Sequence, residues 1–190
     1  MRALQTAANQ AYDRLCDLRL GVETAGSDCS PTPYRLVRRA FDALNLAPSD
    51  GLIDFGAGRG RIVCYAAQYP IARVEGVEIS EPSTAAGQRN VGRLRRRRAD
   101  RVAMVHGSAT EIDCDWANIF YFANPFGERI FQDVLANIRR SLDRMPRAGR
   151  FVYFHPTCSH LLDAQEWLAP RQVIHADRGG RPSVLLYHTR

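Results

Sequence analysis

The feature that most limits the fold of this sequence is a short apolar run followed by three closely spaced glycines. Residues 52–55 have the pattern of a buried strand, and Gly56, Gly58 and Gly60 follow at alternate positions before a helix-like stretch. Glycine permits the positive φ angles of a tight turn and lets the backbone approach a ligand where a Cβ would collide. Open α/β sheets bind nucleotides at this kind of strand-to-helix turn. We therefore predict a ligand-binding loop at residues 56–60.

Strand-like and helix-like segments alternate from residue 51 onward, which is the pattern of a parallel sheet covered by helices on both faces. The predicted strands are 52–55, 73–78, 101–106, 119–123, 151–154, 173–176 and 184–188, and the predicted helices are 60–68, 83–97, 128–142 and 158–167. Turn-forming residues separate the last two strands, so an antiparallel hairpin is expected there, since a parallel pair needs a crossover. The expected fold class is α/β, with a mostly parallel seven-stranded sheet and a C-terminal antiparallel hairpin.

The first 50 residues have a different pattern from the rest. Apolar residues at helical spacing predict a helix over 3–20 and a second one beginning near Tyr34, with a loop at 21–30 between them. At 190 residues the chain fits a single structural domain. We expect an N-terminal helical segment at 1–50 and the sheet domain at 51–190.

Composition favours a cytoplasmic protein that does not enter a membrane. The five cysteines form no C-x-x-C pair and are odd in number, which favours free thiols in a reducing compartment. The longest apolar stretches have the length of a strand, too short to cross a bilayer. All 26 basic residues are arginine, and several cluster between residues 93 and 101. This cluster is interpreted as a solvated helix end, so a nucleic-acid partner is an alternative that is not favoured.

Two carboxylates flank the glycine loop and indicate the kind of ligand. The G-x-G-x-G spacing differs from the G-x-G-x-x-G of dinucleotide sites, which argues against an NAD-dependent oxidoreductase. Asp54, just before the turn, suits an ammonium group better than a diphosphate. Glu78 ends the second predicted strand 24 residues after Asp54. It could accept hydrogen bonds from both ribose hydroxyls or, alternatively, stabilise the start of the next helix.

With these motifs, residues 30–190 resemble the class I S-adenosylmethionine-dependent methyltransferases, which have a Rossmann-like fold. Asp-Phe-Gly-Ala-Gly-Arg-Gly at 54–60 is similar to the family's cofactor loop, and Gly-Val-Glu-Ile-Ser at 76–80 to its ribose-binding strand end. His-Gly-Ser-Ala-Thr at 106–110 stands where the family often has Gly-Asp-Ala, with Ser108 in place of the acid. The resemblance implies S-adenosylmethionine as cofactor, bound by Thr32, Tyr34, Asp54, Gly56, Ala57, Gly58, Glu78, Ile79, Ser108, Ala109 and Asn124.

Asn124, Pro125 and Phe126 follow the fourth predicted strand and resemble the Asn-Pro-Pro-aromatic motif of amino methyltransferases. In that motif the asparagine and the next backbone carbonyl hold the acceptor nitrogen beside the methyl group. The resemblance implies that these three residues are the catalytic group, although the second proline is missing here. A plain turn that starts the next helix is the alternative reading. The methyl acceptor is unidentified, with a protein or a small molecule favoured.

More narrowly, the chain resembles compact bacterial methyltransferases without assigned substrates and, distantly, protein lysine methyltransferases outside the SET class. In such relatives the segment before the sheet folds over the cofactor, which implies this role for residues 1–50. A non-catalytic S-adenosylmethionine- or RNA-binding protein with the same fold is the alternative function. His155, Cys158 and His160 lack the spacing of an established zinc motif, so no metal site is predicted. His155 is a candidate base, although a structural histidine is the favoured interpretation.

Overall fold

The computed structural model of the chain describes residues 14–17, 19–22, 32–170, 172–175 and 182–190. The helices are α2 (Tyr34–Leu44), α3 (Arg61–Ala66), α4 (Glu81–Arg93), α5 (Glu128–Arg144) and α6 (Ser159–Asp163). The strands are β1 (Gly51–Phe55), β2 (Arg73–Glu78), β3 (Arg101–His106), β4 (Ile119–Phe122), β5 (Arg150–Phe154), β6 (Gln172–His175) and β7 (Pro182–His188). Within this described part, no helix has the length and apolar content needed to cross a bilayer.

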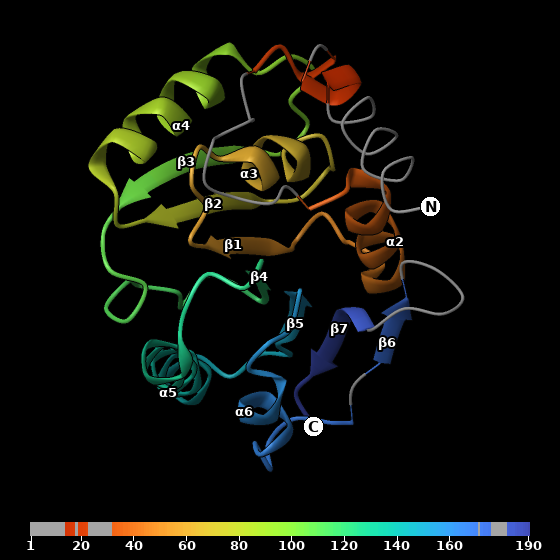
Figure 1. Cartoon of the computed structure of the whole chain (residues 1–190), viewed down its shortest axis with the longest axis vertical. Helices are drawn as coiled ribbons and strands as arrows, with labels where there is room; N and C mark the ends of the chain where they lie inside the picture. Colours follow the sequence, from red (N-terminus) through yellow and green to blue (C-terminus); the bar gives the residue numbers. More distant parts are fainter. Residues whose placement is uncertain (1–13, 18, 23–31, 171, 176–181) are drawn as a thin grey trace.

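The strands form one seven-stranded sheet in the order β3-β2-β1-β4-β5-β7-β6 (Figure 1). Strands β1 to β5 pair in parallel, and β7 pairs antiparallel with both β5 and β6. The predicted mostly parallel sheet with a C-terminal antiparallel hairpin is therefore confirmed. Within the hairpin, β7 lies next to β5 and β6 takes the edge. Because β1 to β5 run the same way, the loops that follow them gather at one edge, which we call the carboxyl edge.

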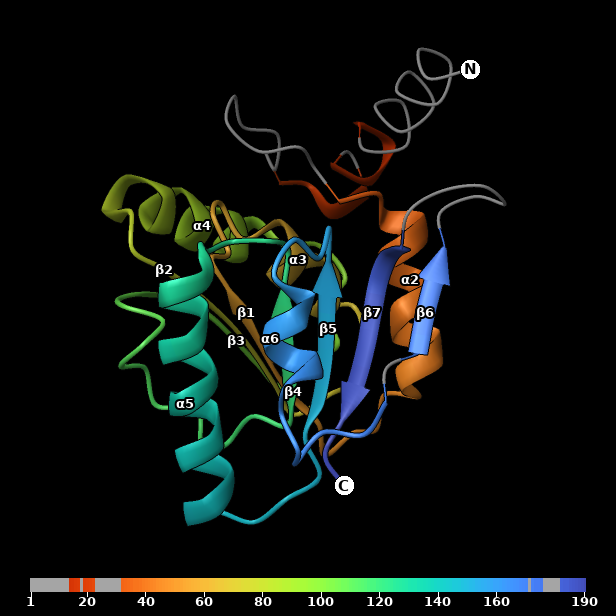
Figure 2. The same cartoon turned by 60° about the horizontal axis from the view of Figure 1, so that its bottom comes forward.

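Helices cover both faces of the sheet, as predicted (Figures 1 and 2). Helices α2, α3 and α4 cover one face, where Phe41 of α2 and Val63 of α3 belong to one apolar core. Helices α5 and α6 cover the other face, where Phe131 of α5 packs in a second core. Side chains alternate between faces along a strand. Leu52 therefore lies in the first core and Phe55 in the second.

The N-terminal predictions are confirmed where the structure describes them. Residues 14–17 and 19–20 are helical, and the remainder of the predicted helix 3–20 lies outside the described residues. Helix α2 buries its apolar positions from Tyr34 to Leu44. These side chains join the same core as the sheet, so α2 packs as part of the sheet domain.

Three helices have boundaries that differ from the sequence expectations. Helix α4 begins at Glu81, because the Ser80 side chain accepts a hydrogen bond from the Ser83 N–H and a proline stands in the first turn. It ends at Arg93, before the arginine run. The predicted helices 60–68 and 158–167 are shortened to α3 and α6 by tight turns at their ends. Ile130 has helical spacing with the core residues of α5 but is 49% exposed.

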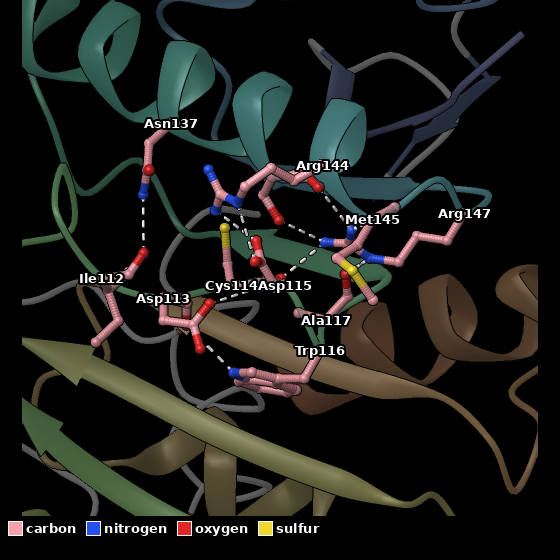
Figure 3. Close-up of polar contacts among 11 residues, drawn as sticks. Ile112, Asp113, Cys114, Asp115, Trp116, Ala117, Asn137, Arg144, Met145 and Arg147 are labelled. Carbon is pink, nitrogen blue, oxygen red and sulfur yellow. Dashed lines mark hydrogen bonds and ion pairs between the residues drawn. The ribbon is translucent and has the colours of Figure 1, made fainter.

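A polar clamp ties the end of α5 to the segment that enters β4 (Figure 3). The Arg147 guanidinium donates hydrogen bonds to the carbonyl oxygens of Ala117, at 2.6 Å, and Cys114, at 2.7 Å, and to the Ser141 hydroxyl, at 2.8 Å. Arg144 pairs with Asp115 through two hydrogen bonds. Because β4 ends at the carboxyl edge, this clamp fixes the strand that carries the Asn-Pro-Phe segment.

Candidate functional site

The glycine loop joins β1 to α3 at the carboxyl edge of the sheet. Gly56, Gly58 and Gly60 have φ angles of 73°, 54° and 76°, all in the left-handed region that favours glycine. The N–H groups of Gly56 and Ala57 donate to the Val77 carbonyl at the end of β2, at 2.9 and 3.0 Å. A Cβ placed on Gly58 would meet no described atom within 4 Å. This part of the loop is therefore open to a ligand.

Two close contacts hold the glycine loop between the Asn-Pro-Phe segment and α4. A Cβ on Gly56 would lie 2.5 Å from the Cβ of Pro125. At the other end of the loop, a Cβ on Gly60 would lie 2.9 Å from the Met104 sulfur of β3 and at an ordinary contact distance of 3.6 Å from the Gly87 Cα of α4. Glycine at these positions lets the three segments pack closely. The predicted cofactor loop and the predicted acceptor segment are therefore in direct contact.

Glu78 ends β2 beside the loop. One carboxylate oxygen accepts a hydrogen bond from the Gly58 N–H at 2.8 Å, and the other accepts one from the Ser80 N–H at 2.9 Å. Glu78 thus stabilises the start of α4, which was one of the two interpretations. A carboxylate has about four lone-pair positions, so two remain for ligand hydroxyls. Ile79, the next residue, is 73% exposed, which is high for a large apolar side chain beside a glycine loop.

Asp54 is a buried carboxyl group at the end of β1, only 3% exposed. It accepts no hydrogen bond from any residue that the structure describes. Burial and, to a smaller extent, the negative charge of Glu78 raise the pKa of Asp54 to about 8. A cation that approached this carboxyl would compensate for the lost hydration. The geometry therefore fits a ligand ammonium.

Thr32 and Tyr34 lie close to Asp54 in the fold. The buried Tyr121 of β4 is paired with Asp54 in the sheet, and its hydroxyl lies among Asp54, Thr32 and Arg61, with burial raising its pKa well above the ordinary value. Tyr34 is fully buried, and the Arg61 guanidinium lies 4.3 Å from its ring centre. Tyr34 is thus a core residue of α2.

Ser108 and Ala109 follow β3 at the same edge. The Ser108 hydroxyl shares a 2.7 Å hydrogen bond with the Thr110 hydroxyl and accepts one from the Thr110 N–H at 3.3 Å. It therefore shapes its own turn. The Ala109 side chain packs in the second core at 9% exposure, so only its backbone is available to a ligand.

Asn124 has a φ of 54°, an unusual angle for a residue other than glycine. Its side-chain oxygen accepts hydrogen bonds from the Tyr153 hydroxyl, at 3.1 Å, and from the Thr157 hydroxyl, at 2.5 Å. The Tyr153 oxygen in turn accepts a hydrogen bond from the Cys158 N–H at 3.2 Å. These contacts fix the orientation of the asparagine side chain. The sequence reasoning missed Tyr153 and Thr157, because no local motif marks them.

Pro125 and Phe126 complete the predicted acceptor segment. Both are partly buried. Pro125 contacts the glycine loop, and Phe126 packs against the second core. Phe126 is thus anchored on one side by the core, which holds the segment at a fixed distance from β4.

The histidines near β5 do not form a metal-binding cluster with other described residues. His155 is exposed, has a φ of 49°, and has its imidazole pKa lowered by partial desolvation. His160 approaches Glu128 of α5 at 3.4 Å. His155 therefore stands at the carboxyl edge, but not in the buried hydrogen-bonded setting of a structural histidine.

The arginine run from 95 to 98 lies away from this edge. It connects the end of α4 to the start of β3, and β3 begins at the opposite, amino edge of the sheet. All four arginines are exposed, and Arg97 donates hydrogen bonds to the carbonyl oxygens of Ala99 and Asp100 in its own turn. This placement agrees with a solvated helix end.

Comparisons with known proteins give one sequence relative and many similar folds. No family model matches the sequence. A protein-lysine N-methyltransferase from Saccharolobus islandicus is 25% identical over 159 residues, covering 83% of this chain and 90% of that protein. Solved structures under 25% identical resemble this fold. They include an RNA methyltransferase from Salinibacter ruber in complex with S-adenosyl-L-homocysteine, with a TM-score of 0.58 and 23% identity over 84% of this chain and 92% of that chain.

A second solved structure, a glycopeptide N-methyltransferase with S-adenosyl-L-homocysteine, has a TM-score of 0.61 and 13% identity, covering 86% of this chain and 92% of that one. The strand order, the glycine loop with its two carboxylates and the sequence relative all agree. The chain is thus similar in fold to S-adenosylmethionine-dependent methyltransferases, as the resemblance to the class I enzymes implied, and similar in sequence to one methyltransferase.

Proposed function

We propose that this chain transfers the methyl group of S-adenosylmethionine to a nitrogen atom of a protein, with the lysine side chain as the favoured acceptor. The observation that carries the proposal is the contact between Gly56 of the cofactor loop and Pro125 of the acceptor segment. This contact supports the proposal that these two segments belong to one site. The relative from Saccharolobus islandicus, a protein-lysine N-methyltransferase, supports the choice of acceptor.

The residues at the carboxyl edge fit this cofactor. Asp54, buried and without a described hydrogen-bond donor, would bind the ammonium of the methionine part. The remaining lone pairs of Glu78 would accept the ribose hydroxyls, and the exposed Ile79 side chain would cover the adenine. The open face of Gly58 leaves room for the ligand backbone. Ser108 and the Ala109 backbone would bound the adenine pocket.

Segment 1–50 would cover the cofactor in this proposal. Thr32 and the ring of Tyr34 lie in the cluster around Tyr121 and Asp54, which supports a place for this segment at the pocket. Residues 23–31 lie outside the described residues. The support for a capping role therefore comes only from the positions of Thr32 and α2.

Catalysis in this site requires alignment rather than a nucleophilic side chain. The bound cofactor supplies a methyl group activated by a sulfonium, and the acceptor nitrogen displaces it directly. The chain would hold the nitrogen at Asn124, whose side chain Tyr153 and Thr157 fix in one orientation. Phe126 would bound the acceptor and favour its developing positive charge. Holding two reactants in line lowers the barrier by several kcal/mol.

A cytoplasmic location is part of the same proposal. The cysteines at 64, 114 and 158 are free and buried. Burial raises the pKa of Cys64 to about 12, so this thiol is unreactive at neutral pH. Free thiols of this kind are typical of a reducing compartment.

The test is methyl transfer from labelled S-adenosylmethionine to a lysine-rich protein, with the same protein after chemical acetylation of its lysines as the control. The chain contains no lysine, so label on a lysine side chain cannot come from the enzyme itself. We expect label in the unmodified protein only. Equal label in both proteins would exclude lysine as the acceptor.

Asn124→Ala separates transfer from cofactor binding. We expect the variant to lose turnover by about a hundredfold or more, because the acceptor is no longer aligned. Its dissociation constant for S-adenosylmethionine, measured by calorimetry, should stay within about twofold of the wild-type value. Unchanged turnover would remove Asn124 from the site. A wild-type chain that binds the cofactor but methylates nothing would instead support the non-catalytic alternative.

A further inference from the structure

A groove runs between the glycine loop and one face of α4. It has a volume of about 230 Å³ and is lined by residues that include Arg59 from the loop and Pro82, Ser83, Arg89, Asn90 and Arg93 from α4. The positions on α4 recur at helical spacing, so they share one side of the helix. The groove therefore begins at the cofactor loop and extends along α4.

The floor of the groove is built by close packing of the loop on the helix. The Asn90 amide donates a hydrogen bond to the Arg59 carbonyl oxygen at 3.0 Å. A Cβ on Gly87 would lie 3.2 Å from the backbone carbonyl carbon of Arg59. Asn90 is only 4% exposed. The loop and α4 are thus held together, and the groove is a fixed feature rather than a gap between loose segments.

The rim of the groove carries positive charge. Arg59, Arg89 and Arg93 are all exposed. None of the described residues that line the groove carries a carboxylate or an aromatic ring. Arginine presents planar hydrogen-bond donors that match carboxylate groups. A ligand for this groove must therefore be anionic.

We propose that the groove binds an acidic segment of the protein that is methylated. This inference depends on the proposed protein acceptor and specifies which protein segments the enzyme favours. Single-stranded nucleic acid fits less well, because its bases stack on aromatic rings and the described lining offers none.

The distance to the acceptor segment suits a short peptide. Arg59 follows Gly56 by three residues, so their Cα atoms are at most about 11 Å apart. Gly56 in turn contacts Pro125. An extended peptide advances about 3.3 Å per residue. An acidic residue that pairs with Arg59 would therefore lie roughly three to six positions from the methylated lysine.

The experiment measures binding of a fluorescein-labelled decapeptide that has one lysine and glutamates four to six positions away. The control peptide has glutamine in place of glutamate. We expect the wild-type chain to bind the glutamate peptide more tightly, by about twofold to thirtyfold, as for two surface charge pairs. Arg89→Ala with Arg93→Ala should remove this preference. The control variant, Arg35→Ala with Arg140→Ala, removes the same amount of charge from α2 and α5. It should keep the preference for the glutamate peptide.

Two results would overturn the inference. One is equal binding of the two peptides by the wild-type chain. The other is a preference for the glutamate peptide that the α4 double variant retains. Tighter binding of a ten-nucleotide RNA than of the glutamate peptide would also count against the inference. The dissociation constant for S-adenosylmethionine is measured on the same samples. Failure of cofactor binding would refute the proposed function, whereas loss of the peptide preference with intact cofactor binding would refute the groove alone.

Discussion

Asp54 makes cofactor binding depend on pH in a way that can be calculated from the structure. With a pKa of about 8, about one Asp54 carboxyl in ten is ionised at pH 7 and about one in a hundred at pH 6. The cofactor ammonium binds the ionised form. If only this form is competent, affinity falls in proportion to its population, so it should rise about tenfold from pH 6 to pH 7. The rise should flatten near pH 8, where Asp54 is half ionised and the ligand amine also begins to lose its proton.

Calorimetric titration with S-adenosylmethionine at half-unit steps from pH 6 to pH 7.5 measures this slope. Binding should release close to one proton, which is obtained from the dependence of the enthalpy on the ionisation enthalpy of the buffer. Asp54→Asn is the matched variant, since it keeps the shape and removes the charge. It should bind more weakly at pH 7.5 and show neither the slope nor the proton release.

The same carboxyl should also affect stability without ligand. A raised pKa in the folded state means that the folded chain holds the proton more tightly than the unfolded chain. The contribution of Asp54 to the free energy of unfolding is therefore fully present below about pH 4. It decreases by about 1.4 kcal/mol per pH unit between about pH 4 and pH 8, the pKa of Asp54 in the folded chain. Asp54→Asn should lack this loss. A wild-type dissociation constant that stays constant from pH 6 to pH 7.5 would refute the reasoning.

Three further substitutions test the site and its support. Gly56→Ala should lower stability by about 1–3 kcal/mol in chemical denaturation, because its Cβ would meet Pro125 at 2.5 Å, whereas Gly107→Ala, which meets no described atom, should have a small effect. Glu78→Ala should weaken S-adenosylmethionine binding at least tenfold by calorimetry, and an unaltered dissociation constant would remove it from the site. Arg147→Ala should lower the free energy of unfolding by about 2–3 kcal/mol, because several carbonyl oxygens lose their donor, and an unchanged denaturation midpoint would contradict this account of the clamp.

The sequence predicted those parts of the site that are formed by residues adjacent in the sequence. The glycine loop and Glu78 each follow a strand directly, so the strand pattern and the glycine spacing were enough to place them at one edge. The contact of Gly56 with Pro125 joins two such predicted segments. The roles of the individual residues remain predictions.

The contacts that fix Asn124 could not be predicted. Tyr153 and Thr157 are 29 and 33 residues away along the chain, and they reach Asn124 only because β4 and β5 are neighbours in the sheet. The sequence order of the strands does not state which pairs touch.

The place of β7 within the sheet has a consequence for how the chain is made. Strand β6 is synthesised before β7, yet among the described strands it pairs only with β7. During synthesis on the ribosome, β6 therefore has no strand to pair with until β7 has been made. Strand β7 then pairs with both β6 and β5. A pairing that must wait for a later strand slows folding and leaves an unpaired β5 edge open to other chains. The strand synthesised last therefore joins β6 to the parallel part of the sheet.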